Sequence, residues 1–321
     1  MLTTRFTKLV GCSIPIQQAP IGALANPELA AAVTNAGGFG MLALSGATLQ
    51  EVDEDLSKVR SLTTGVFGVN FVLQFSDPEE IKDLIAAAAA RAPIVEIFYS
   101  DPDPKLIEII HKGKALAAWQ LGSREEAIAA EAAGCDFITA QGNAAGGHVR
   151  GSISLLPLLD EVLEAVNIPV LAAGGIGSGR AMAAALAAGA DGVRVGTRFV
   201  GSLEAGAHPE YVDALIAARA QDSVYTELFS VGWPDAPHRV LRASINAVNA
   251  FQGDVVAHDT ESGEMVARFA TISPRKAHAG SIRAMPNWAG ESVGGVRKLQ
   301  PAAEIVTELA AEAESLLRRW A

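Results

Sequence analysis

Along the first 200 residues, short apolar runs alternate with longer segments in which apolar positions recur every third or fourth residue. Short runs of this kind are typical of buried strands, and the periodic segments are typical of amphipathic helices. We predict strands over residues 14–20, 38–44, 66–73, 93–99, 114–121, 136–142, 169–175 and 192–199. Helices are expected between them, over residues 27–36, 48–61, 78–90, 103–112, 123–133, 153–166 and 178–188.

A weak internal repeat supports this alternation. The segments TNAGGFGML, EAAGCDFIT and LAAGADGVRV each contain a helix end, an alanine-glycine pair and the start of a strand. A glycine after a helix readily adopts the left-handed conformation that ends it. Strands that are apolar along their length need helices outside them, so we predict an α/β fold, a closed (β/α)8 TIM barrel. A doubly wound open sheet is the alternative.

The strand-helix alternation stops near residue 200, which suggests three parts. Residues 1–202 would form the barrel. Residues 203–285 are interpreted as a smaller, mostly helical or irregular inserted subdomain. The final segment, 286–321, contains one amphipathic stretch, which we expect to pack back on the barrel as a helix.

Composition narrows the class of protein. The 321 residues are 50% hydrophobic and 19% charged, which is enough apolar material for a large core. The net charge of −11, without a basic patch, argues against nucleic-acid binding. We recognise neither a signal peptide nor a membrane span and no metal-ligand spacing, so we expect a cytoplasmic protein without a metal site. Cys12 and Cys135 are expected to be reduced core residues.

Two glycine-containing stretches follow the last two predicted strands, where barrels of this kind bind phosphate. Gly174, Gly175 and Gly177 would leave backbone N–H groups uncovered before a helix, and Gly196 and Thr197 would add further donors. Tight turns without a ligand are the alternative interpretation. Because the chain has neither a Walker loop nor a dinucleotide fingerprint after its first strand, we expect a mononucleotide or a sugar phosphate.

Amide side chains stand in or at the ends of several otherwise apolar strands. They are Gln17, Gln18, Asn70, Gln120 and Gln141. An amide both donates and accepts, so this set suits a planar heterocycle with ring N–H and carbonyl groups. Each of them could instead be a buried amide with a structural role.

One histidine stands out among six. His148 follows a Gly-Gly pair in QGNAAGGHVRG, directly after a predicted strand, and a neutral imidazole there could act as a base. A hydrogen-bonded loop residue is the alternative. Among the other histidines, which lack metal-ligand spacing, only His238 is a candidate for the same site.

Taken together, these residues resemble the nitronate monooxygenases, FMN-dependent enzymes formerly called 2-nitropropane dioxygenases. The matching pieces are PIQQAP, NPELAAAVTNAGGFGML, FGVN, QGNAAGGH, PVLAAGGIGSGRAMAAALAAGADGVRVGTRF and WAGESVG. Related enoyl-acyl-carrier-protein reductases and NADH:quinone reductases share much of this pattern. The family usually has a glutamate at the position of Ala144 and lacks the extra Val149 before Arg150.

The resemblance implies a TIM barrel with FMN at the carboxyl ends of the strands. His148 would be the catalytic base, and the phosphate would lie on Gly174, Gly175, Gly196 and Thr197. The remaining cofactor-binding residues would be Ala19, Pro20, Asn70, Gln120, Gln141, Gly142, Gly146, Gly147 and Ala173.

The implied reaction is oxidation of an alkyl nitronate by oxygen to a carbonyl compound and nitrite. His148 would either take the α-proton of a neutral nitroalkane or orient a nitronate already formed. An NAD(P)H-dependent flavin reductase of the same superfamily and a non-enzymatic flavin-binding protein are the alternatives. The expected partners are the nitronate and oxygen, with neither nucleic acid nor membrane, and a homodimer is the candidate assembly.

Overall fold

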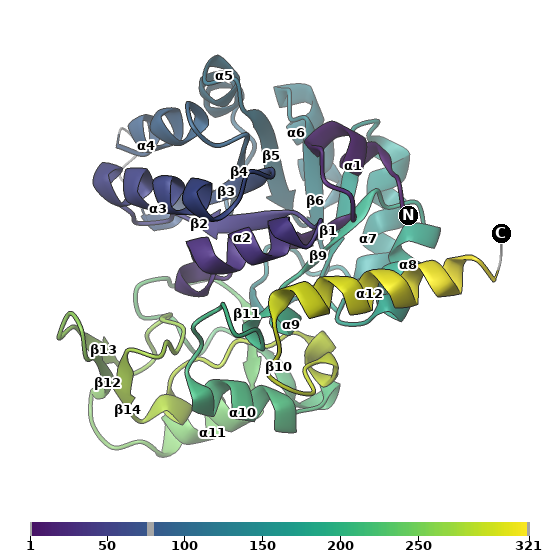
Figure 1. Cartoon of the computed structure of the whole chain (residues 1–321). Coiled ribbons are helices and arrows are strands. Elements are labelled where there is room, and N and C mark those ends of the chain that lie inside the picture. Colours follow the sequence, from purple (N-terminus) through teal and green to yellow (C-terminus); the bar gives the residue numbers. More distant parts are fainter. Residues whose placement is uncertain (1, 76–79, 320–321) are drawn as a thin grey trace.

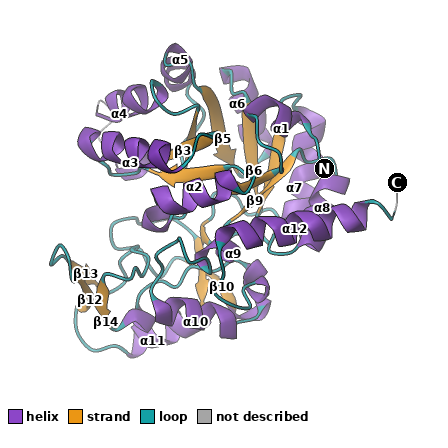
Figure 2. Ribbon diagram, in the orientation of Figure 1, coloured by secondary structure: helices purple, strands orange, loops and turns teal. Residues whose placement is uncertain are grey.

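The structure is a computed structural model that describes residues 2–75 and 80–319. Eight parallel strands form a ring with helices outside it (Figures 1 and 2). Their order around the ring is β1 (Ile16–Gln18), β9 (Gly192–Val195), β8 (Val170–Ala173), β6 (Phe137–Gln141), β5 (Leu116–Leu121), β4 (Ile94–Phe98), β3 (Phe67–Val72) and β2 (Gly40–Ala43). A parallel bridge between Gln17 and Phe39 closes the ring. This confirms the TIM barrel and excludes the open sheet.

The helices that cover the barrel follow its strands in turn. They are α2 (Pro27–Asn35), α3 (Leu49–Leu62), α4 (Glu80–Ala89), α5 (Pro104–Lys112), α6 (Arg124–Ala133), α7 (Leu155–Ala165) and α8 (Gly179–Ala187). Their predicted ranges agree to within two residues at each end, except that residues 78 and 79 lie outside the described part of the chain. Caps explain the agreement, because Thr48, Ser123 and Ser178 each accept a backbone N–H of the helix that follows.

The last barrel strand is shorter than predicted. The range 192–199 was expected to be one strand, but β9 ends at Val195 and Thr197–Val200 form a short helix, α9. Gly196, at φ −110° and ψ −78°, begins that helix. TIM barrels often place such an extra helix after the eighth strand, beside a phosphate site.

A helix that the sequence pattern did not predict closes the amino-terminal end of the barrel. It is α1 (Arg5–Val10), and its Phe6 contacts Phe39 and Phe137 edge to face at centroid distances of 5.7 and 5.3 Å. These rings and their apolar neighbours fill the barrel at the start of the strands. The opposite end, where the strands finish, is therefore the end available for a ligand.

The segment after the barrel has more strands than expected. Besides α10 (Pro209–Ala217) and α11 (Arg242–Ala250), it contains β10 (Ser223–Thr226), β11 (His238–Leu241), β12 (Val255–Asp259), β13 (Met265–Ala267) and β14 (His278–Gly280). They form two three-stranded antiparallel sheets, β10-β11-β7 and β13-β12-β14, where β7 is Gly147–His148. The expectation of a mostly helical segment missed these strands, because runs of three to five residues carry little periodicity.

The chain ends on the helix α12 (Ala302–Leu317), which lies along α8 and contacts α2 (Figure 1). Its inner face, including Ile305, Val306 and Leu309, is buried. The amphipathic stretch thus forms a helix on the barrel, as expected. The three domain boundaries themselves remain a prediction.

Candidate active site

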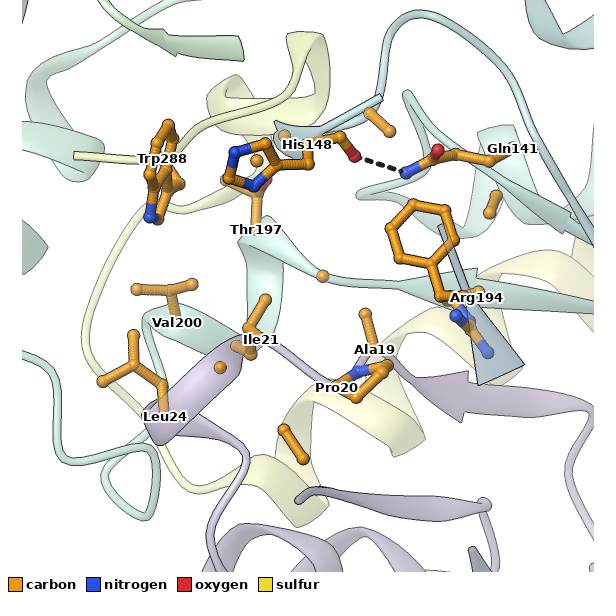
Figure 3. A pocket seen from close by; sticks show the side chains of 18 of the residues that line it. Ala19, Pro20, Ile21, Leu24, Gln141, His148, Arg194, Thr197, Val200 and Trp288 are labelled. Atoms are coloured by element: carbon orange, nitrogen blue, oxygen red, sulfur yellow. Dashed lines mark hydrogen bonds between the residues drawn. The ribbon is translucent and has the colours of Figure 1, made fainter. Parts of the chain in front are cut away.

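A cavity lies at the carboxyl ends of the barrel strands, where residues from the later segments also reach it. All the site residues that the family resemblance implies line this cavity except Gly142. Figure 3 shows Ala19 and Pro20 on one side of the pocket and His148 with Trp288 on the other. The structure therefore brings together residues from β3, β5, β6, β8 and β9, and from the segment directly after β1, that are far apart in the sequence.

Some of the predicted residues do not line the cavity, among them Gly142, Gln17 and Gln18. A Cβ on Gly142 would stand 2.6 Å from the backbone nitrogen of Leu155, so close packing requires glycine there. The Gln17 side chain accepts from Arg194, and the Gln18 side-chain oxygen accepts from the Met41 N–H at 2.9 Å. The side-chain oxygens of both amides are thus engaged within the barrel.

One end of the cavity is lined by backbone rather than by charged side chains. Gly174 and Gly175 have φ of +101° and +74°, the left-handed region that favours glycine. Thr197 Oγ1 accepts the Gly290 N–H at 3.0 Å, so its own hydroxyl proton is available to a ligand. Ser292 also lines this end, and Gly177 packs against it instead of facing the cavity. Such a cradle of N–H and O–H donors suits a phosphate.

The other end holds a buried polar cluster inside the barrel. Arg194 of β9 forms an ion pair with Glu96 of β4, and both side chains are almost completely buried. Asn70 donates to Glu96 at 2.9 Å, and Gln120 accepts from Arg194. Glu96 and Arg194 had no place in the predicted site, although a charged residue within the apolar runs IVEIF and GVRV is a usable signal.

Gln141 holds the loop that carries His148. Its Nε2 donates to the His148 carbonyl at 3.0 Å, and its Oε1 accepts the Arg150 N–H at 3.2 Å. Figure 3 shows the first of these bonds. The loop also joins the next sheet, because His148 pairs with His238 across β7 and β11.

Aromatic side chains surround the imidazole of His148. The ring stacks on Trp233 with a centroid distance of 3.9 Å and an interplanar angle of 24°, and Trp288 lies 5.4 Å away. The Tyr211 hydroxyl donates to the Trp288 carbonyl at 2.6 Å and so holds that residue in place. Trp233 was missed, since no spacing in the sequence points to it.

The environment of His148 keeps its ring neutral. Its Nε2 is buried and has no hydrogen-bond partner among the residues that the structure describes. Burial, with a smaller effect of nearby His238, lowers the pKa of His148 to about 3. At neutral pH the imidazole is therefore uncharged, and it holds a proton more weakly than an ordinary histidine.

His238 was the second histidine considered for the site. Its Nε2 accepts the Phe229 N–H at 3.3 Å, and its Nδ1 lies 2.9 Å from the Ala236 carbonyl. Both ring nitrogens thus contact backbone groups, and the ring does not line the cavity. Burial also lowers the pKa of His238. His238 lies beside His148 through the pairing of β11 with β7.

Ala144 replaces a carboxylate, yet the loop is anchored from other elements. The Glu291 N–H donates to the Ala144 carbonyl at 3.0 Å, and the Glu291 carboxylate pairs with Arg239 at 2.9 Å. Arg239 also donates to the Asn143 carbonyl. On the other side of the loop, Arg150 pairs with Glu126 at 2.6 Å. Glu291 lies in the stretch WAGESVG, far from Ala144 in the sequence.

None of the helices that the structure describes is both long and apolar enough to cross a bilayer.

Comparison with known proteins identifies the family. The family model described as nitronate monooxygenase matches residues 3–312. A (3aS,4S,5R,7aS)-5-hydroxy-7a-methyl-1-oxo-octahydro-1H-indene-4-carboxyl-CoA dehydrogenase of Rhodococcus jostii is 35% identical, over 76% of this chain and 67% of its own. A probable nitronate monooxygenase of Staphylococcus aureus is 29% identical, over 90% and 91% of the two chains. The structure of a nitroalkane oxidase from Streptomyces ansochromogenes is 29% identical, with a TM-score of 0.78, and 99% of this chain and 100% of that one are covered. The chain belongs to the nitronate monooxygenase family and is a flavin-dependent oxidoreductase.

Proposed function

We propose that the protein binds FMN and oxidises small alkyl nitronates with oxygen to a carbonyl compound and nitrite. The observation that carries this proposal is the buried Nε2 of His148, which has no partner within the described chain and lies at a cavity with a donor cradle at one end and amides at the other. Bound FMN would supply a ring that takes up and releases electrons. The protein contributes position and access.

The residues at both ends of the cavity fit this cofactor. Gly174, Gly175, Thr197 and Ser292 would hold the phosphate, because they offer backbone and hydroxyl donors without a competing side chain. Asn70 and Gln120 would face the ring. Each has one half of its amide engaged inside the barrel, and the other half, which has no partner among the described residues, would serve the ring edge.

The neutral His148 favours a nitronate over a nitroalkane as the substrate. A base whose conjugate acid has a pKa of about 3 is a poor acceptor for the α-proton of a nitroalkane. The same uncharged ring can hydrogen-bond a nitronate oxygen. We therefore assign His148 the orientation of a nitronate already formed, and we expect low activity on neutral nitroalkanes.

The cavity wall near His148 indicates a short apolar substituent. Ile21, Leu24 and Val200 line it together with Trp288 (Figure 3). Arg194 is the one cation among the lining residues of the described chain, and it is already paired with Glu96. Inside this cavity an acidic substituent would find no free counter-charge.

A flavin reductase or dehydrogenase acting on a thioester is the second candidate. The relative from Rhodococcus jostii, at 35% identity, is named for a carboxyl-CoA substrate. Its presence among the similar proteins is the observation that favours this candidate. The apolar cavity wall formed by Ile21, Leu24 and Val200, which indicates a short substituent, favours the small nitronate instead.

Anaerobic mixing separates the two candidates. The FMN-loaded protein is mixed with ethylnitronate and, separately, with NADH, while the flavin absorbance is followed. We expect rapid bleaching with ethylnitronate and none with NADH. His148→Ala should slow the bleaching by about a hundredfold, whereas His111→Gln, at the exposed ion pair with Asp136, should leave it unchanged. Rapid bleaching by NADH alone would favour the second candidate.

A further inference from the structure

A buried ion pair crosses the inside of the barrel at the end of the cavity that Arg194 lines. Glu96 and Arg194 come from β4 and β9, which lie opposite each other in the ring, and they are 0% and 4% exposed. A buried pair of this kind usually adds little stability, because removing two charges from water offsets their attraction. A role other than stability is therefore needed to explain this ion pair.

The partners of the pair suggest that reason. Glu96 accepts from Asn70 Nδ2 at 2.9 Å, and Arg194 donates to Gln120 Oε1. A carboxylate accepts hydrogen bonds and a guanidinium donates them, so neither amide can rotate by 180° without losing its partner. Among the described residues, Asn70 Oδ1 and Gln120 Nε2 have no hydrogen-bond partner, which leaves one acceptor and one donor. Both residues line the cavity.

We propose that the Glu96–Arg194 pair fixes the hydrogen-bonding polarity of the flavin-ring site, so that Asn70 presents an acceptor and Gln120 presents a donor. This rests on the proposed binding of FMN, whose ring edge carries both an N–H group and carbonyl oxygens. Glu96 and Arg194 are positioning residues in this assignment, because they act through the two amides. Without the pair, each amide would also populate the flipped orientation, in which like groups face each other.

The test compares FMN binding in three proteins. The variant Glu96→Gln/Arg194→Met removes both charges together, because removing one would leave the other buried and unpaired. Thr139→Val is the matched control, since Thr139 donates to Glu96 at 3.3 Å, and in the described chain no side-chain hydrogen bond joins it to either amide. Thermal unfolding verifies that each protein is folded. FMN affinity is measured by quenching of flavin fluorescence, and infrared difference spectra record the carbonyl bands of the bound flavin.

We expect the double variant to bind FMN about tenfold more weakly, which is about 1.4 kcal/mol. Its flavin carbonyl bands should move toward those of FMN in water, while the control keeps the wild-type bands and an affinity within about twofold. A folded double variant with wild-type affinity and unchanged bands would overturn the proposal and leave the proposed function standing. Failure of the wild-type protein to bind FMN would overturn both.

Discussion

His148 should reveal its environment in the acid stability of the apoprotein. Its pKa is about 3 in the folded chain, and an ordinary histidine titrates near 6.5, so between these values the unfolded state binds one more proton. The contribution of His148 to the free energy of unfolding is constant above pH 6.5 and is lost as the pH falls toward 3. From pH 7 to 5, wild type should therefore lose about 2 kcal/mol more stability than His148→Gln. Urea unfolding at the two pH values measures this difference. Equal losses would show that His148 is protonated normally in the folded protein.

Single residues divide into those that the sequence could place and those that it could not. The glycines, Asn70 and His148 were found because their types are unusual at the ends of apolar strands. Trp233 was not found, since an aromatic residue in an irregular segment has the same pattern whether it lines a cavity or a core. Its stacking on His148 depends on the pairing of β7 with β11, which joins segments about 90 residues apart in the sequence.

At the scale of elements, the barrel was predictable because each strand is a continuous apolar run and each helix has a 3.6-residue period. The small sheets were not, since their strands are short and their pairing is decided by tertiary contacts. The prediction of a single strand over residues 192–199 was wrong for a related reason. Apolar residues continue through Phe199 and Val200, although the backbone changes from strand to helix at Gly196.

The loop between β8 and α8 allows a direct test of the cofactor site. Gly175→Val should yield colourless protein, because a side chain would enter the proposed phosphate cradle as well as strain a backbone at φ +74°. Gly263→Val controls for strain, since Gly263 has φ +77° with open space around it in the turn between β12 and β13. That variant should unfold at a lower temperature yet retain FMN. The ratio of flavin to protein absorbance gives the occupancy. Full occupancy in Gly175→Val would contradict the assignment of this loop.

At the scale of the whole molecule, the cavity is built by three parts of the chain that meet around one loop. The barrel supplies the cradle and the amides, the segment after it supplies Trp233, and the C-terminal segment supplies Trp288 and Ser292. The loop of His148 belongs to the barrel by sequence and to the sheet β10-β11-β7 by hydrogen bonding. Its position therefore depends on how the parts are joined.

Arg239 is the side chain that joins them. It donates to the carbonyls of Asn143 and Ser223, at 2.5 and 3.3 Å, and pairs with Glu291 at 2.9 Å, so one guanidinium contacts all three parts. Arg239→Gln should retain FMN, because the cradle does not contain this residue, but kcat/KM for ethylnitronate should fall about tenfold as His148 loses its position. Arg242→Gln is the control, since its exposed guanidinium reaches the Gln221 carbonyl at 3.4 Å. Steady-state oxygen consumption and flavin occupancy measure the two effects. Similar kinetics in both variants would show that the His148 loop keeps its position without the guanidinium. Loss of FMN from Arg239→Gln would show that the contacts of Arg239 also support cofactor binding.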